Sequence, residues 1–289
     1  MAKYLITGVS GQLGHDIVRE LESRGIKDYK AVDIEEMDIT KKDEVDHIIG
    51  IYEPEVIFHC AAWTQVDRAE EEDKEKIVTA INVTGTRFIA QAAKKINSKL
   101  LYISTDYVYD GTKKGIYTET DRPSPKSVYG ITKLLGEEEA LENPKTFIVR
   151  TSWVFGINGN NFIKTMLRLS DTASELNVVR DQVGSPTYTV DLAKLLVDMS
   201  DTDKYGIYHA TNEGYTSWAD FAEYIFKVNN KEVLVNHVST EEYLRITKAR
   251  QAYRPRNSRL SKDKLEDNGF DKLPTWKDAV KRYCRELKK

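Results

Sequence analysis

Thr7-Gly8-Val9-Ser10-Gly11-Gln12-Leu13-Gly14 carries the strongest structural signal in the chain, because it sets three glycines between a strand and a helix. The apolar run Tyr4–Ile6 before it predicts a strand, and Leu13, Ile17 and Leu21 are spaced for one face of a helix. In this setting the glycines permit a tight turn, a close approach of the backbone to a pyrophosphate, and close packing of helix on strand. The first amide groups of the helix then attract phosphate. The stretch therefore predicts dinucleotide binding; without its flanking elements, a plain turn would be an equal alternative.

Short apolar runs alternate with helical patterns along the first half of the chain, which predicts βαβ units. We expect an α/β fold of Rossmann type, a parallel sheet with helices on both faces. Further strands are predicted at Tyr29–Val32, Val56–Phe58, Leu100–Ile103 and Phe147–Val149. Helices are predicted at Lys41–Tyr52 with Thr40 as N-cap, from about Ala69 to Lys95 with a break near Asn82–Gly85, and at Ser127–Leu141.

The alternation weakens near residue 155, in a loop rich in Gly and Asn at Gly156–Asn161. We therefore expect an NAD(P)-binding Rossmann domain over residues 1–155 and a smaller, mainly substrate-binding lobe over residues 156–289. Parts of about residues 178–205 are expected to pack back on the Rossmann domain.

The bulk composition excludes several classes of protein. The 289 residues carry a formal net charge of −3, with 40% hydrophobic and 31% charged residues. This balance fits a globular protein and gives no general attraction to nucleic acid or to an anionic membrane. No apolar run approaches the ~20 residues that a membrane helix needs, and the start lacks the pattern of a signal peptide. Cys60 and Cys284 lack the spacing of a zinc site, so we expect a reduced, cytoplasmic protein.

Asp33 follows the second predicted strand, 19 residues after Gly14. In a dinucleotide-binding fold an acid at this place accepts hydrogen bonds from the adenosine ribose, which favours NAD over NADP. Asp38 lies further along and is expected on the adenine side. The alternative for both carboxylates is a solvated turn. Lys41 and Lys42 keep NADP open, so NADPH and NADH are both candidate cofactors.

Tyr129-Gly130-Ile131-Thr132-Lys133 places a phenol and an ammonium four residues apart, on one face of a helix. A phenol has a pKa near ~10, which a neighbouring ammonium lowers, so Tyr129 is expected to act as a general acid on a carbonyl oxygen. Thr105 follows the strand predicted at Leu100–Ile103, where its hydroxyl could bind the same oxygen. Tyr-x-x-x-Lys alone is common by chance on surface helices. Together with the glycine loop and a threonine at a strand end, it indicates catalysis.

With these motifs the chain resembles the extended short-chain dehydrogenase/reductase family, and within it the dTDP-4-dehydrorhamnose reductases. The resemblance spans nearly the whole chain in order, which is far more specific than either general motif. Besides Gly8–Gly14 and Tyr129–Lys133, the segments that carry it are Cys60–Thr64, Val66–Glu70, Ser104–Tyr109, Arg150–Phe155, Asn160–Phe162, Asp181–Thr187 and Arg254–Leu260.

The resemblance implies hydride transfer from NADPH or NADH to the C4 keto group of dTDP-4-dehydro-L-rhamnose, which gives dTDP-L-rhamnose. Tyr129 would protonate the keto oxygen, Lys133 would hold the nicotinamide ribose and lower the Tyr129 pKa, and Thr105 would orient the oxygen. The residues implied for the cofactor are Gly8, Ser10, Gly11, Gln12, Leu13, Asp33, Asp38, Ile39, Ala61, Ala62, Tyr129 and Lys133. Those implied for the substrate are Thr105, Asp106, Tyr107, Trp153, Asn161, Phe162 and Arg254.

Two of these residues have an alternative. Trp153 would pack against the sugar, or serve as a core residue at the end of a strand. Arg254 belongs to a basic cluster with Arg250, Arg256 and Arg259, from which one guanidinium is expected to grip the diphosphate of the substrate. Arg254 itself could instead only position the turn before the next proline.

Several other functions stay open at this point. A dehydratase is disfavoured, because dehydratases of this fold place an Asp-Glu pair where the chain has Asp106-Tyr107. An epimerase is disfavoured only by the reductase-like segments, and a related 4-keto-sugar reductase would use the same Tyr–Lys pair. A non-catalytic regulatory subunit is disfavoured because Thr105, Tyr129 and Lys133 are all present.

The resemblance also raises a Mg²⁺ ion that joins two subunits through carboxylates. Asp16 and Asp191 lie where two of its ligands are expected, but their side chains are shorter and no third ligand is evident at the C-terminus. Magnesium demands oxygen ligands in strict geometry, so ordinary roles for both aspartates are favoured and no metal site is predicted. A monomer and a homodimer both stay open. The expected partner is the nucleotide-sugar substrate.

Overall fold

A parallel six-stranded sheet lies at the centre of the part of the chain that the structure, a computed structural model, describes: residues 3–248 and 251–288. The strand order is β10-β5-β4-β3-β1-β2, and each strand runs parallel to its neighbours. The strands are β1 (Tyr4–Thr7), β2 (Tyr29–Val32), β3 (Val56–His59), β4 (Lys99–Thr105), β5 (Thr146–Thr151) and β10 (Gly206–His209). This arrangement confirms the expected Rossmann-type fold.

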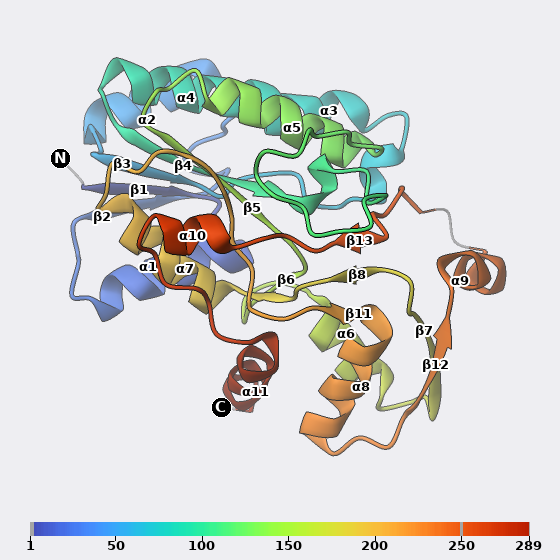
Figure 1. The fold of residues 1–289 in the computed structure, drawn as a ribbon. Coiled ribbons are helices and arrows are strands. Elements are labelled where there is room, and N and C mark those ends of the chain that lie inside the picture. Colours follow the sequence, from blue (N-terminus) through green and yellow to red (C-terminus); the bar gives the residue numbers. More distant parts are fainter. Residues whose placement is uncertain (1–2, 249–250, 289) are drawn as a thin grey trace.

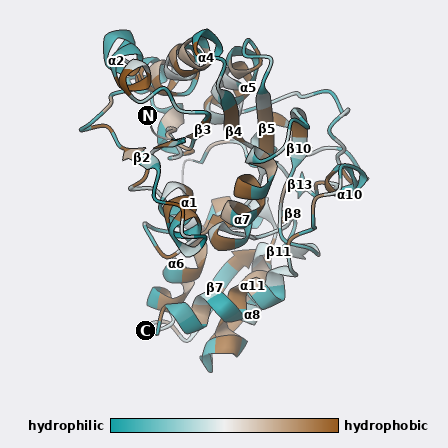
Figure 2. Cartoon of the chain, turned by 90° about the vertical axis from the view of Figure 1, so that its left-hand side faces the viewer, coloured by the Kyte–Doolittle hydropathy of each residue, from teal (hydrophilic) through white to brown (hydrophobic). Residues whose placement is uncertain are grey.

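Helices cover both faces of this sheet (Figure 1). One face carries α2 (Lys42–Tyr52), α4 (Thr86–Lys95) and α5 (Val128–Ala140); the other carries α1 (Gln12–Ser23), α7 (Thr189–Ser200) and α10 (Asp263–Asp267). Successive side chains of β1 enter opposite cores, with Leu5 packed on the α2 and α4 side and Ile6 on the α1 and α7 side. Strands that are buried on both faces have continuous apolar sequences. Figure 2 shows such hydrophobic residues on β3, β4 and β5 between the helices.

The second lobe is built on an aromatic core beside the sheet (Figure 1). Phe155 stacks on Tyr188 and Phe221 packs edge-on against Trp276, with ring centroids 5.3 Å and 5.7 Å apart. The lobe contains the helices α6 (Phe162–Leu169), α8 (Trp218–Asn229), α9 (Thr240–Thr247) and α11 (Trp276–Glu286). Its strands are β6 (Val154–Phe155) with β9 (Thr187–Tyr188), β7 (Glu175–Val179) with β12 (Leu234–Val238), and β8 (Val183–Gly184) between β11 (Thr216–Ser217) and β13 (Asn257–Ser258). None of the described helices combines the length and the apolar character that crossing a membrane requires.

The chain returns to the central sheet after it has entered the second lobe. α7 packs against α1, and β10 pairs with β5 as the edge strand of the sheet. α10, still later in the chain, contacts β10. The part of the molecule built on the sheet is therefore assembled from separate stretches of sequence: α7 lies within the range of about residues 178–205 that was expected to pack back on the Rossmann domain, and β10 and α10 lie beyond that range.

Two local predictions are wrong. Thr40 is not the N-cap of α2, which begins after Lys41; the Thr40 hydroxyl donates instead to Asp38 Oδ1 at 2.7 Å. The long helix begins at Glu75 and not near Ala69; where a break was expected, near Asn82–Gly85, α3 (Glu75–Thr79) passes through a π-helical turn at Ala80–Gly85 into α4. That turn aims the Asn82 side chain inward, where it accepts from the backbone N–H of Trp63 and donates to the Thr132 hydroxyl.

A buried ion pair fastens α5 to the sheet. Glu137 on α5 accepts two hydrogen bonds from Arg150 on β5, at 2.8 Å from Nε and 2.6 Å from Nη2. The two side chains are only 2% and 3% exposed, and Ser104 near the end of β4 donates to the same carboxylate. A bidentate pair with its remaining oxygen sites occupied can offset the cost of desolvating two charges. The pair therefore fixes α5 against β4 and β5.

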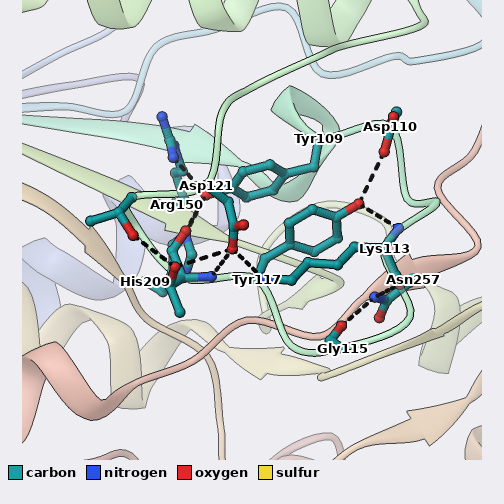
Figure 3. A network of polar contacts seen from close by, with 11 residues as sticks. Tyr109, Asp110, Lys113, Gly115, Tyr117, Asp121, Arg150, His209 and Asn257 are labelled. Atoms are coloured by element: carbon teal, nitrogen blue, oxygen red, sulfur yellow. Dashed lines mark hydrogen bonds and ion pairs between the residues drawn. The ribbon is translucent and has the colours of Figure 1, made fainter.

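Arg150 extends this network to the loop after β4 (Figure 3). Its Nη1 donates to the Tyr109 hydroxyl at 2.7 Å, and that hydroxyl lies 2.9 Å from His209 Nε2 at the end of β10. Burial lowers the pKa of His209 to about 3, with the Arg150 charge acting in the same direction, so the imidazole is neutral. Tyr109 also stacks on Tyr117, with ring centroids 4.2 Å apart. One guanidinium thus links α5, three neighbouring strands and the loop that follows Tyr109.

Glu137→Gln should lower the free energy of unfolding by about 3–5 kcal/mol, because it keeps the shape of the side chain but leaves the Arg150 charge buried and unpaired. Urea unfolding followed by circular dichroism measures the change. The matched control is Glu139→Gln on the same helix, which breaks an exposed pair with Arg87 and should cost less than about 1 kcal/mol. Equal effects of the two substitutions would contradict this account.

Candidate active site

The main cavity, of about 560 Å³, opens where the strands of the sheet end and the second lobe begins. This is the edge at which open α/β sheets bind their ligands. Its wall includes all residues that the sequence assigned to the cofactor: Gly8, Ser10, Gly11, Gln12, Leu13, Asp33, Asp38, Ile39, Ala61, Ala62, Tyr129 and Lys133. Of the residues assigned to the substrate, it includes Thr105, Asp106, Tyr107 and Trp153.

The glycine loop brings the start of α1 to the floor of this cavity. A Cβ on Gly14 would lie 2.4 Å from the carbonyl oxygen of Gly8, so no larger residue fits between loop and helix. Gly11 is the N-cap of α1 and provides no side-chain acceptor for the first amides of the helix. These N–H groups and the positive end of the helix dipole are free to bind phosphate.

Asp33 directly follows β2 and is hydrogen-bonded to the glycine loop. Its Oδ2 accepts from the backbone N–H of Ser10 at 2.8 Å and from the Ser10 hydroxyl at 2.6 Å. Burial raises the pKa of Asp33, but the hydrogen bonds from Ser10 and Ile34 outweigh it and hold the pKa below its usual value. Burial likewise raises the pKa of Asp38, but the hydrogen bonds from Thr40 outweigh it and hold that pKa below its usual value. Two carboxylates therefore carry full negative charge at this end of the cavity.

Tyr129 and Lys133 are placed by the start of α5. The N-cap Ser127 accepts from the backbone N–H of Gly130 at 3.1 Å, and Glu70 accepts from that of Val128 at 2.8 Å. A Cβ on Gly130 would lie 2.3 Å from the backbone oxygen of Tyr107, so the glycine lets α5 approach the chain after β4. This approach brings the phenol and the ammonium to the Thr105 end of the cavity.

Burial dominates the protonation of this pair. It raises the pKa of Tyr129, although the Thr105 hydroxyl acts in the opposite direction. It lowers the pKa of Lys133 to about 7, against the charge of Glu137, and the ammonium lies 3.9 Å from the centroid of the Tyr102 ring. In the protein alone burial raises the Tyr129 pKa, and the expectation that Lys133 lowers it stays a prediction. Tyr129 holds its proton at neutral pH.

The substrate side of the cavity begins at the turn after β4. Asp106 is buried and accepts from the hydroxyls of Thr105 and Ser258, and burial raises its pKa to about 6 in spite of these bonds. The Tyr107 ring meets the Tyr129 ring edge-on, with centroids 5.4 Å apart. Trp153 has a positive φ of 51° and stacks on Trp218 at 3.7 Å while it lines the cavity. The stacking on Trp218 fits the expected core role, and the expected packing against the sugar stays a prediction.

Three of the residues assigned to the substrate do not line the cavity. Asn161 is the N-cap of α6 and donates to Gln12 Oε1 at 3.1 Å, and the neighbouring Asn160 reaches the cavity instead. Phe162 packs against Trp218 in the aromatic core. Arg254 donates to Tyr107 and Asp67 at the rim. Within the basic cluster, Arg256 pairs with Glu241, Arg259 bonds Asn257 and the carbonyl of Lys114, and Arg250 lies outside the described residues.

The cavity wall also contains residues that the sequence did not single out as site residues. They are Thr7, Gly14, Val32, Ile34, Met37, Cys60, Thr64, Val66, Ile81, Ile103, Ser104, Thr151, Ser152, Val154 and Asn160. Thr151 is notable because it pairs with Thr105 across β4 and β5. Its buried hydroxyl has no hydrogen-bond partner among the described residues. Its position at a strand end, within the Arg150–Phe155 segment that carries the resemblance, is the signal that the sequence offered.

Asp16 and Asp191 do not form a site for Mg²⁺, because arginines already occupy their oxygens. Arg19 donates to Asp16 at 2.9 Å, and Thr189 donates to its other oxygen. Arg282 donates to both oxygens of Asp191, at 2.9 Å and 2.7 Å. A cation placed here would have to displace two guanidinium groups and would be repelled by them. The interactions are those of two ordinary ion pairs.

Comparison with known proteins gives a consistent picture along the whole chain. The model of the family described as RmlD substrate binding domain matches residues 2–289. The dTDP-4-dehydrorhamnose reductase of Aggregatibacter actinomycetemcomitans is 44% identical, over 97% of this chain and 98% of that protein. The spore coat polysaccharide biosynthesis protein SpsK of Bacillus subtilis is 38% identical, over 99% and 98%. The crystal structure of dTDP-4-dehydrorhamnose reductase from Bacillus anthracis in complex with NADP superposes with a TM-score of 0.92 at 40% identity, covering 99% of this chain and 100% of that one. The chain therefore belongs to the RmlD substrate binding domain family.

Proposed function

We propose that this protein reduces the C4 keto group of dTDP-4-dehydro-L-rhamnose with NADPH or NADH, which gives dTDP-L-rhamnose. The observation that carries the proposal is a single cavity lined at one end by the glycine loop and Asp33 and at the other by Thr105, Tyr129 and Lys133. The relatives that cover nearly the whole chain include named dTDP-4-dehydrorhamnose reductases, which supports this substrate. The protein is expected to act in the cytoplasm, as a monomer or a homodimer.

The residues of the chain account for binding and for proton transfer. The amides at the start of α1 would bind the pyrophosphate of the cofactor, and Asp33 would accept from a ribose hydroxyl. When bound, the reduced nicotinamide supplies the hydride. Tyr129 gives its proton to the keto oxygen as that oxygen gains negative charge, and the hydroxyl of Thr105 orients the same oxygen. Because burial keeps Tyr129 protonated, the free protein is already in the state that reduction needs.

Alternative functions are distinguished at the turn after β4. A dehydratase needs a second acid next to Asp106, but the chain has Tyr107 there, and the Tyr107 hydroxyl is bonded to Arg254. An epimerase or a reductase of another 4-keto sugar would use the same Tyr129 and Lys133. A regulatory subunit would have no need for a tyrosine, a lysine and a threonine brought together in one cavity.

The decisive experiment supplies purified protein with dTDP-4-dehydro-L-rhamnose and follows the loss of absorbance of NADPH and, separately, of NADH. Wild-type protein should turn over, and Tyr129→Phe should lower kcat by about 10²–10⁴-fold, because the ring remains while the transferable proton is lost. No oxidation of either cofactor by folded wild-type protein would overturn the proposal. Activity with a different 4-keto sugar alone would favour the related reductase.

Asp33 should decide between the two cofactors. Its ionised carboxylate would bind the ribose hydroxyls of NADH and repel the 2′-phosphate of NADPH. Asp33→Asn should therefore raise the ratio of kcat/KM for NADPH to that for NADH by about tenfold, a change of ~1.4 kcal/mol in relative transition-state binding. Glu35→Asn, on the same loop, is the control. An unchanged ratio in Asp33→Asn would show that this carboxylate does not contact the ribose.

Lys133 should make the stability of the protein depend on pH. Its pKa is about 7 in the folded protein, whereas a lysine in the unfolded chain has its ordinary pKa of 10.5, so between these values the unfolded chain binds one more proton. The free energy of unfolding then rises with pH across this window, and the cost of burying the ammonium is greatest below about pH 7. Lys133→Met removes that cost, so its melting temperature should exceed that of the wild type by more at pH 6 than at pH 9. A gain that is equal at both pH values would refute a depressed Lys133 pKa.

A further inference from the structure

Residues 251–256, here called the strap, cross from the second lobe to the rim of the cavity, where the carboxylate of Asp67 binds two of them. Asp67 Oδ1 accepts from the backbone N–H of Ala252 at 3.0 Å, and Oδ2 accepts from Arg254 Nη2 at 2.6 Å. The side chain of Asp67 thus binds both a main-chain group and a side chain of the strap. It belongs to the Val66–Glu70 segment, to which the reaction as described assigns no task.

The strap reaches the catalytic residues through Arg254. While Nη2 is bonded to Asp67, Nη1 donates to the Tyr107 hydroxyl at 3.0 Å. The ring of Tyr107 lies edge-on to that of Tyr129 and forms part of the cavity wall. A chain of direct contacts therefore leads from Asp67 through Arg254 and Tyr107 to the proton donor.

Arg254 keeps donors free for a second anion. A guanidinium has five N–H groups, and the hydrogen bonds to Asp67 and Tyr107 use two of them. The side chains of Arg254 and Asp67 are 28% and 44% exposed, so the pair lies at the rim, where a phosphate group could approach. Two further contacts fix the rest of the strap: Tyr253 donates to the carbonyl of Asp110 at 2.8 Å, and Pro255 packs tightly on Gly111.

We propose that Asp67 is a positioning residue for the nucleotide-sugar substrate. It holds Arg254 so that the remaining N–H groups meet the diphosphate and Tyr107 keeps its place beside Tyr129. This inference rests on the proposed function. An exposed ion pair contributes little to the stability of the fold, so loss of Asp67 affects binding of the sugar and leaves the melting temperature nearly unchanged.

Asp67→Asn tests the inference, because the amide can still accept from Ala252 but presents an N–H group to a guanidinium. KM for dTDP-4-dehydro-L-rhamnose should rise about tenfold, because the substitution removes the equivalent of one charge-assisted hydrogen bond. KM for NADPH and the melting temperature should not change, and Asp67→Glu should recover part of the affinity. The matched control is Glu241→Gln, which breaks the exposed pair with Arg256 on the same strap and should leave every constant unchanged.

Limited proteolysis provides a readout that does not depend on turnover. Trypsin should cleave the Arg256–Asn257 bond faster in Asp67→Asn than in the wild type, because the strap has lost its anchor. If the wild type is active, an unchanged KM for the sugar in Asp67→Asn would overturn the inference, and so would an unchanged rate of cleavage. If the wild type shows no turnover, the proposed function fails by itself, and faster cleavage in the variant would still support the anchoring role of Asp67.

Discussion

The ion pair between Glu137 and Arg150 is the constraint on which the site depends. It is buried, bidentate and supported by Ser104, and it joins α5 to the two strands that end at the cavity. Glu137 lies one helical turn after Lys133, which itself lies one turn after Tyr129, so fixing the glutamate fixes the face of α5 that carries the two proposed catalytic residues. A hydrophobic contact would leave that face free to rotate by small amounts, whereas a bidentate pair selects one orientation.

The same pair affects the charge of the site. Glu137 stabilises the Lys133 ammonium, yet burial lowers the pKa of that lysine to about 7. The site thus holds a tyrosine that keeps its proton and a lysine near the midpoint of its titration. In this state Tyr129 holds the proton that the proposed reduction requires. Burial of these groups lowers the free energy of unfolding, as is common where a functional site is desolvated.

Ion pairs at several places join the second lobe to the elements that pack on the sheet. Arg254 reaches from the second lobe to Asp67, and Arg282 reaches from α11 to Asp191 on α7. Arg19 on α1 contacts both Asp16 and Glu286, the latter on α11. Guanidinium groups therefore occupy the carboxylates for which the family resemblance raised a metal. A fixed cation on a side chain performs the same neutralisation without a requirement for octahedral geometry.

The sequence by itself determined the parts of the site that lie close together along the chain. The glycine loop, Asp33 after β2 and the spacing of Tyr129 and Lys133 are local patterns, and local backbone geometry carries them into the structure almost unchanged. Burial, which the spacing of Tyr129 and Lys133 does not reveal, raises the pKa of the tyrosine and lowers that of the lysine.

Contacts between distant segments could be decided only by the tertiary structure. Asp67 and Arg254 are 187 residues apart, and Thr151 lies beside Thr105 only through the register of β4 and β5. β10 joins the sheet from beyond the range of about residues 178–205 that the sequence pattern assigned to it. The N-cap of α2 and the π-helical turn before α4 likewise depend on which partner a side chain meets. No local pattern encodes such pairings, because they arise where the chain crosses itself, and one strand or helix fits several neighbours until the packing of the whole selects one.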